Sequence, residues 1–186
     1  MIRGLFFDLD GTLVNTHEAN FLAYKRAFAE NGIDLTRDAF KQTIGMQARE
    51  FIPLIADVTE EGVISSIMLQ KATYYKEYMH MSERNEPLIE FIQYTKVNHT
   101  IALVTSAKRS NATTVINHHR LEDLFDIVVC AEDVKQPKPN PEAYLNALAA
   151  AGLKAHEVVA FEDSDSGIKA AESAGISVIK INDYTL

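Results

Sequence analysis

The sequence predicts an α/β protein with a doubly wound parallel sheet and a small α-helical cap inserted after the first strand. Three observations support this prediction. Short apolar runs rich in β-branched residues alternate with helical stretches over most of the 186 residues, and a polar cluster follows each of the first four runs. One long segment, residues 15–82, has helical periodicity and no convincing strand. Such alternation favours parallel strands joined by right-handed crossovers.

Five apolar runs are the expected strands: residues 2–7, 100–104, 127–130, 158–161 and 177–181. Each is nearly continuous in hydrophobicity, as expected of strands buried on both faces. The carboxyl ends of parallel strands meet at one edge of the sheet, where open α/β sheets bind ligands. We therefore expect a Rossmann-like core with its binding edge at the polar clusters.

Three helices are expected between the later strands, and their ends are marked by particular residues. Pro87 lies in the first turn of a helix over residues 87–92, where proline is tolerated. A second helix spans residues 141–151 and ends at Gly152, and a third spans residues 167–174 and ends at Gly175. Glycine is common just past a helix end, so both boundaries are well marked.

The segment over residues 15–82 is the expected cap. Phe21, Tyr24, Ala27 and Phe28 fall on one face of a helix that Gly32 terminates. Helical periodicity continues over residues 39–44, 48–55 and 60–78. We therefore expect an α/β catalytic core over residues 1–14 and 83–186, with a helical cap over residues 15–82.

The composition limits the class of protein. The formal net charge is −8, and an acidic chain without a basic run is a poor candidate for binding nucleic acid. No apolar run approaches the roughly 18 residues that span a bilayer. The start runs directly into the first strand, so we expect no secretory signal. The single cysteine, Cys130, is expected to be a buried strand thiol. These features favour a cytoplasmic protein without membrane or nucleic-acid partners. We expect a monomer or weak homodimer, although no sequence feature decides the oligomeric state.

Two carboxylates stand just after the first strand. Asp8 and Asp10 are one residue apart in the segment DLDGT, residues 8–12. Two acids beside a buried strand are costly unless they are neutralised, and a hard divalent cation does this through oxygen ligands. The same pair can divide the work of phosphoryl transfer, one attacking phosphorus and the other moving a proton. The alternative is an ordinary Asp-Gly turn after an edge strand.

A hydroxyl pair and a lysine follow at later strand ends. Thr105 and Ser106 come directly after the second strand and could hold a phosphoryl oxygen, or simply cap a helix. Lys138 lies between Pro137 and Pro139, which stiffen the backbone around one cation. A fixed cation is useful where negative charge accumulates, although a solvated loop lysine is an equal alternative.

A second acidic pair follows the fourth strand. Glu162 and Asp163 lie in the segment FEDSDSG, residues 161–167. Asp163 could complete a metal site of oxygen ligands, with Glu162 as a further ligand or a hydrogen-bond acceptor beside it. The serines of the same segment, residues 164 and 166, could instead cap the following helix.

The order of acid pair, hydroxyl, lysine and acid pair, each at a different strand end, resembles the haloacid dehalogenase superfamily of phosphotransferases. The resemblance covers nearly the whole chain. The position of the insert is similar to the helical cap of the branch that holds β-phosphoglucomutases and sugar-phosphate or phosphoglycolate phosphatases. The dehalogenase members are less similar, because they lack the second aspartate that Asp10 supplies here.

The resemblance implies a role for each acidic residue. Asp8 would be the nucleophile that forms an aspartyl-phosphate. Asp10 would protonate the leaving oxygen and then activate water, while its backbone carbonyl would bind the metal. Asp8, Asp163 and Glu162 would bind the same metal, expected to be Mg²⁺ because the ligands are hard oxygens.

The resemblance also implies roles for the groups that bind phosphate. Thr105 and neighbouring groups at Gly11, Thr12 and Ser106 would bind the phosphoryl oxygens. Lys138 would balance charge between Asp8 and the phosphate. These roles agree with the chemistry, because phosphoryl transfer depends mostly on positioning and neutralisation.

The cap contains two candidate substrate-binding cations. Arg49 lies in a glycine break at residues 44–50 and could meet a hydroxyl, a carboxylate or a second phosphate, although an arginine next to Glu50 is often a solvated surface residue. Lys71 lies in the long helix before two tyrosines and is the weaker candidate, because charged helix faces usually point to water.

Together these observations predict a phosphoric monoester hydrolase: a Mg²⁺-dependent phosphatase of small phosphorylated metabolites, most of all sugar phosphates. The first alternative is a phosphomutase similar to β-phosphoglucomutase, which would use the same aspartate and return the phosphoryl group to a sugar. The second is a catalytically silent binding protein that keeps the fold, for which the sequence offers no support because every catalytic position is filled.

Overall fold

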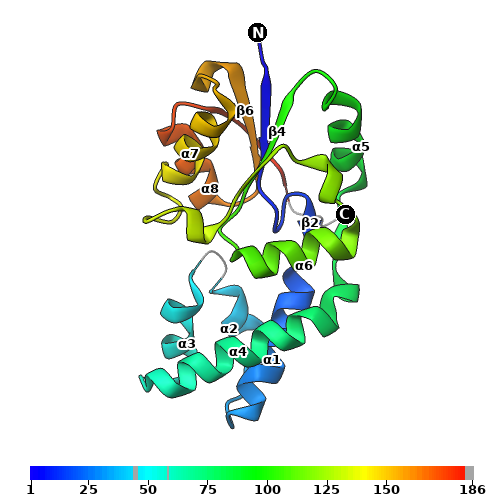
Figure 1. Cartoon of the computed structure of the whole chain (residues 1–186). Coiled ribbons are helices and arrows are strands. Elements are labelled where there is room, and N and C mark those ends of the chain that lie inside the picture. Colours follow the sequence, from blue (N-terminus) through cyan, green and yellow to red (C-terminus); the bar gives the residue numbers. More distant parts are fainter. Residues whose placement is uncertain (44–45, 58, 183–186) are drawn as a thin grey trace. The chain divides into compact units, whose positions relative to one another are not determined.

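A computed structural model describes residues 1–43, 46–57 and 59–182 of the chain. The chain divides into two compact units. One consists of Met1–Asn15 together with Glu83–Leu186, and the other of Thr16–Ser82. Figure 1 shows the course of the chain through both units. The first unit is built around a parallel sheet, and the second is helical.

The first unit confirms the predicted α/β fold class. Its sheet consists of β1 (Gly4–Phe7), β4 (Thr100–Val104), β5 (Ile127–Val129), β6 (Val158–Glu162) and β7 (Ser177–Lys180). The strand order is β5-β4-β1-β6-β7, and every neighbouring pair is parallel. After β1 the chain adds β4 and β5 on one side of it, and then returns to add β6 and β7 on the other side. The reversal places the carboxyl ends of β1, β4 and β6 side by side, at the position where such sheets bind ligands.

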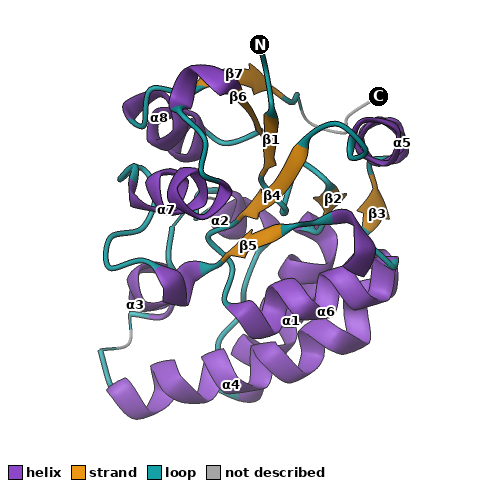
Figure 2. Cartoon of the chain, turned by 45° about the horizontal axis from the view of Figure 1, so that its top comes forward, coloured by secondary structure: helices purple, strands orange, loops and turns teal. Residues whose placement is uncertain are grey.

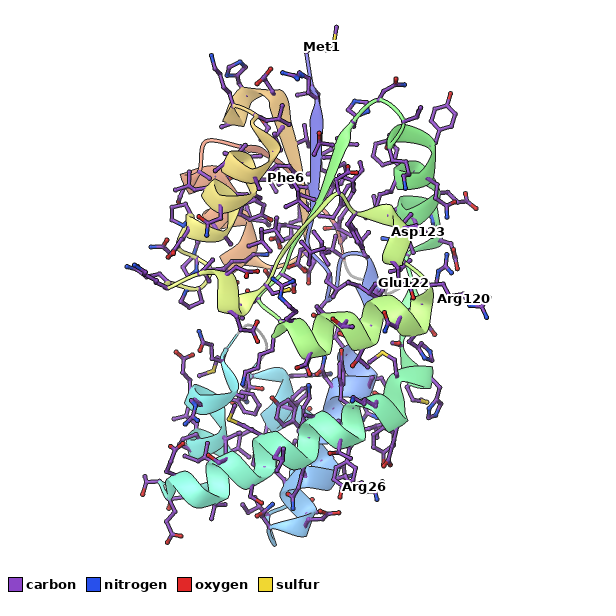
Figure 3. The ribbon with its side chains drawn as sticks, in the orientation of Figure 1. Met1, Phe6, Arg26, Arg120, Glu122 and Asp123 are labelled. Atoms are coloured by element: carbon purple, nitrogen blue, oxygen red, sulfur yellow. The ribbon has the colours of Figure 1, made fainter. Side chains whose placement is uncertain are left out.

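Helices cover both faces of this sheet (Figure 1). They are α5 (Glu86–Thr95), α6 (Arg109–His119), α7 (Glu142–Ala151) and α8 (Asp165–Ser173). Successive strand residues point to opposite faces. Phe6 is fully buried in the core that α7 and α8 build on one face (Figure 3). Phe7 stacks on Phe161, which in turn contacts Phe91 of α5 on the other face. Both sides of the central strand are thus packed, so β1 is held rigidly where it ends in Asp8.

The helix ends in this unit follow the expected signals. α5 has proline at its start, α7 ends at Gly152, and α8 is capped by Ser164, whose hydroxyl accepts a hydrogen bond from the Gly167 amide. Short 3₁₀ turns connect the remaining elements: η2 (Glu122–Leu124), η3 (Ala131–Asp133) and η4 (Ala155–Glu157). Cys130 is buried just after β5, as a thiol with no disulfide partner.

A two-stranded ribbon joins the chain segments that leave and re-enter the first unit. It consists of β2 (Val14–Asn15) and β3 (Glu83–Arg84), which pair antiparallel. These strands were not predicted from the sequence, because two residues are too few for a periodic pattern. Asn85 extends the link, since its backbone amide donates to Leu13 and its side chain donates to the Thr12 carbonyl. The turn that carries the first acidic pair is therefore tied to the start of α5.

The second unit is helical, as expected. It contains α1 (His17–Glu30), α2 (Arg37–Lys41), α3 (Ala48–Ala56), α4 (Glu61–Glu77) and η1 (Tyr78–Met81), drawn in purple in Figure 2. Its core includes Phe28, Ile52 and Ile67, all fully buried. α2 begins at Arg37, earlier than the expected residue 39, because the Thr36 side chain caps it. Within the described residues, no helix is long and apolar enough to cross a membrane.

Candidate active site

The first acidic pair lies in a tight turn at the carboxyl end of β1. Asp8 is buried, and its backbone amide donates to the carbonyl of Phe161 on the neighbouring strand. The Leu9 carbonyl accepts from the amides of Leu13 and Val14, which closes the turn. Gly11 has φ of +90°, a conformation that favours glycine. The turn therefore holds the carboxylate of Asp8 at the strand end.

Lys138 is the buried cation of this site. Its ammonium group lies 2.8 Å from Asp8 Oδ1 and 2.5 Å from Glu162 Oε1, and it also donates to the Val104 carbonyl at 2.8 Å. Its side chain is 3% exposed. The three acceptors come from the ends of β1, β6 and β4, so one ammonium joins three strands. The solvated-lysine alternative is wrong for Lys138.

Burial and neighbouring charges shift the pKa values of Asp8 and Lys138. Burial raises the pKa of Asp8 well above its usual range; Lys138 opposes this rise, while the negative charges of Glu162 and Asp163 reinforce it. Burial alone would lower the pKa of Lys138, but the two carboxylates outweigh it and raise that pKa. Lys138 therefore stays charged. A single lysine is too little to balance three neighbouring carboxylates, so a second cation would favour the ionised form of Asp8.

Glu162 ends β6 and is fully buried. Its Oε1 atom accepts from Lys138 and, at 2.5 Å, from the hydroxyl of Tyr144. Its Oε2 atom is buried without a hydrogen-bond partner in the described part of the chain. The first turn of α8 passes close by: a Cβ atom on Gly167 would lie 2.0 Å from Oε2. Glycine at position 167 is therefore what leaves room for this carboxylate.

Three of the predicted metal ligands gather in one place. Asp8, Glu162 and Asp163 each offer a carboxylate oxygen, and these oxygens lie within 4.8 Å of one another. The Thr12 hydroxyl donates to Asp163 Oδ1 at 3.2 Å, and a Cβ on Gly11 would lie 2.1 Å from Asp163 Oδ2. The set of hard oxygens, the close approach at Gly11 and Glu162 Oε2, which has no partner among the described residues, all fit a small divalent cation.

The other residues predicted for the site are placed as follows. Asp10 lies in the same turn as Asp8 and is half-buried, and its backbone forms an isolated β-bridge with that of Val14. Thr105 directly follows β4 and is buried, with its hydroxyl oxygen accepting from the Ala107 amide at 3.0 Å; Ser106 beside it is exposed. The strand ends thus bring together both acidic pairs, the hydroxyls and Lys138 within the first unit.

The two cap candidates lie in the second unit. Arg49 is exposed near the start of α3 and forms an ion pair with Glu61. The glycine break that was expected to present it includes residues 44–45, which lie outside the described residues. Lys71 is buried, contrary to the expectation of a solvated helix face. Its ammonium lies 3.9 Å from the ring centroid of Tyr75 and 5.1 Å from that of Tyr24, so aromatic faces replace water around it.

Residues 5–181 match the haloacid dehalogenase-like hydrolase family. The chain belongs to this family. A phosphorylated carbohydrates phosphatase of Thermotoga maritima is 31% identical over 183 residues, which are 96% of this chain and 84% of the relative. A fructose-1-phosphate phosphatase of Escherichia coli is 26% identical, over 96% of this chain and 95% of the relative.

Solved structures agree with this assignment. The CbbY protein of Rhodobacter sphaeroides, solved with phosphate, superposes with a TM-score of 0.87, covering 99% of this chain and 88% of its own. At 24% identity it supports the fold alone. A Thermotoga maritima protein provisionally assigned as a β-phosphoglucomutase is 30% identical, with a TM-score of 0.77, over 99% of this chain and 89% of its own. The predicted family, fold class and enzyme type, a phosphoric monoester hydrolase, are confirmed.

Replacing Lys138 by methionine should strongly destabilise the metal-free protein. Removing one partner of a buried ion pair leaves an uncompensated charge and typically costs about 3–5 kcal/mol. We expect a loss of this order in the free energy of unfolding of Lys138→Met, measured by urea denaturation with EDTA at pH 7.5. Lys180→Met is the matched control, because its pair with Asp165 is exposed and 3.5 Å long. Equal stability of Lys138→Met and Lys180→Met would contradict the account.

Alanine at position 11 should weaken metal binding. A new Cβ must push Asp163 aside, since 2.1 Å is far inside van der Waals contact. We expect the dissociation constant for Mg²⁺, measured by calorimetry, to rise by about tenfold or more, the usual range for disturbed ligand support. Gly152→Ala separates this effect from backbone strain, because Gly152 also has positive φ but nothing lies within 4 Å of its Cβ position. Matching Mg²⁺ affinities in the two variants would refute the prediction.

Proposed function

We propose that this protein is a Mg²⁺-dependent phosphatase of small phosphorylated carbohydrates that works through an aspartyl-phosphate on Asp8. The observation that carries the proposal is the buried cluster in which Lys138 bridges Asp8 and Glu162, with Asp163 beside them. Its relatives support the substrate class, because two of them are named for phosphorylated carbohydrates and fructose 1-phosphate. A cytoplasmic location and a monomeric or weakly dimeric state stay predictions.

The metal would be held by the carboxylates of Asp8, Glu162 and Asp163 and by the backbone carbonyl of Asp10. A divalent cation, when bound, supplies positive charge that polarises phosphoryl oxygens and offsets the charge of the transition state. Thr12 supports this set, since its hydroxyl orients Asp163. Mg²⁺ is proposed because all donors are hard oxygens.

The chain's own residues would carry the two chemical steps. In the first, a carboxylate oxygen of Asp8 attacks phosphorus, the bond from phosphorus to the sugar oxygen breaks, and Asp10 gives that oxygen a proton. In the second, Asp10 takes a proton from water as the water oxygen attacks phosphorus. The bond to Asp8 then breaks and inorganic phosphate leaves.

Other groups would hold the phosphoryl group through both steps. Lys138 keeps its positive charge beside Asp8, so it favours the ionised nucleophile and balances the phosphate. The Thr105 hydroxyl can donate a hydrogen bond to a phosphoryl oxygen while it accepts from Ala107. Gly11, Thr12 and Ser106 are proposed to supply further contacts. Such preorganised donors account for much of the rate enhancement of phosphoryl transfer.

Substrate choice is proposed to depend on the helical unit. Arg49 and Lys71 are the candidate cations for a sugar hydroxyl, a carboxylate or a second phosphate. Arg49 is exposed and forms an ion pair with Glu61. An anionic group of the substrate could take the place of the Glu61 carboxylate. The ammonium group of Lys71 lies near the rings of Tyr75 and Tyr24, 3.9 Å and 5.1 Å from their centroids, within the helical unit.

A phosphomutase is the second candidate, favoured by the 30% identity to the protein provisionally assigned as a β-phosphoglucomutase. Asp8 would act in the same way, but the phosphoryl group would return to a sugar hydroxyl instead of water. Isomerisation of β-glucose 1-phosphate faster than its hydrolysis would favour the phosphomutase over the phosphatase.

Phosphate release from a panel of sugar phosphates, phosphoglycolate and nucleotides tests the proposed function. We expect release that needs Mg²⁺, is abolished by EDTA and falls by at least about a thousandfold in Asp8→Asn, because the nucleophile is lost. Asp123→Asn is the matched control, since Asp123 is an exposed aspartate outside the cluster (Figure 3). Undiminished release by Asp8→Asn would refute the mechanism, and no release from any compound would count against the phosphatase.

A further inference from the structure

Tyr144 contacts two residues of the proposed site, although the sequence assigned it no role. It lies in α7, and its side chain is fully buried. Its hydroxyl donates to Glu162 Oε1 at 2.5 Å, and its ring centroid lies 5.3 Å from the ammonium nitrogen of Lys138. One side chain therefore contacts both Glu162 and Lys138, two of the charged residues beside Asp8.

The hydroxyl group is the informative part of this residue. The neighbouring core positions of α7 are apolar, including Ala143, Ala147 and Leu148. A phenylalanine would fill the same space without a polar atom to satisfy, and burying a hydroxyl is costly unless it is hydrogen-bonded. The hydroxyl here has a carboxylate as its acceptor, and a hydrogen bond to a charged group is among the stronger kinds. The Tyr144 hydroxyl therefore matters through its hydrogen bond to Glu162.

Glu162 depends on few donors. Both hydrogen bonds to its carboxylate, from Lys138 and from Tyr144, end on Oε1, while Oε2 faces the first turn of α8 at Gly167. Without the tyrosine hydroxyl, Lys138 would be the one described donor to a buried carboxylate. Lys138 would then be drawn toward Glu162 and away from Asp8, since it forms an ion pair with each of them. The hydroxyl shares the charge of Glu162 and leaves the ammonium group balanced between the two acids.

We propose that Tyr144 is a positioning residue: its hydroxyl and ring hold Glu162 and Lys138 in the arrangement from which they act on Asp8 and on the metal. This inference rests on the proposed function for its catalytic consequence. Its consequence for metal binding needs only the acidic cluster itself. Tyr144 touches neither substrate nor the reacting atoms in this account, so its effect passes through Glu162.

The test compares Tyr144→Phe with Tyr94→Phe, a matched control on α5 whose side chain is 84% exposed. Three quantities are measured: the dissociation constant for Mg²⁺ by calorimetry, kcat and KM on the best substrate of the panel, and the midpoint of thermal unfolding. We expect Tyr144→Phe to raise the Mg²⁺ dissociation constant and to lower kcat, each by about tenfold, the order typical of groups that support metal ligands. KM should change little, the unfolding midpoint should fall because a buried hydrogen bond to a carboxylate is lost, and Tyr94→Phe should match the wild type throughout.

A double-mutant cycle with Glu162→Gln separates positioning from a general packing role. If Tyr144 acts through Glu162, its substitution should have little further effect on Mg²⁺ affinity once Glu162 is changed, so the two effects are not additive. Additive effects would overturn the proposal, as would a Tyr144→Phe variant that keeps wild-type Mg²⁺ affinity and kcat while losing only stability. If the wild type releases no phosphate, the proposed function fails, and the Mg²⁺ arm of the cycle decides this inference alone.

Discussion

The structure depends on one buried ammonium group. Lys138 lies between Asp8 and Glu162 and also binds the Val104 carbonyl, so it joins the ends of the three central strands. Without it, two carboxylates would be buried side by side without a cation, an arrangement that proteins avoid through protonation or unfolding. The lysine allows acidic groups to stay concentrated at one sheet edge. A divalent cation needs such a set of oxygen ligands, and the bound cation and Lys138 would together balance the charge of a phosphoryl group.

The remaining features of the site can be understood as supports for this charge pattern. The reversal of strand order places the ends of β1, β4 and β6 next to one another. Two glycines leave room where side chains would collide with the acids, Gly11 beside Asp163 and Gly167 beside Glu162. Thr12 donates a hydrogen bond to Asp163, and Tyr144 donates one to Glu162. Each support acts on the acid it touches, and together they keep three carboxylates within reach of one cation.

Much of the candidate site could be predicted from the sequence, because the end of a buried strand is marked by a change from apolar to polar residues. An apolar run followed at once by acids identified Asp8 and Asp163, and the paired prolines identified Lys138. The role of Tyr144 could not be predicted, since a tyrosine among alanines and leucines has the pattern of a core residue. The β2–β3 ribbon was missed because its pairing joins residues far apart in the chain. Lys71 was expected in water, yet it is buried against tyrosine rings of two helices, which helical periodicity alone does not show.

The central claim is that Asp8 becomes covalently phosphorylated in this charge environment. The most direct measurement is rapid acid quenching of the enzyme during turnover of its best substrate with Mg²⁺, followed by mass spectrometry of the peptide that contains Asp8. We expect a fraction of this peptide to be heavier by one phosphoryl group on Asp8, and no such fraction in Asp8→Asn or in EDTA. Active turnover with an unmodified Asp8 at every quench time, or a phosphoryl group on another residue, would contradict the claim.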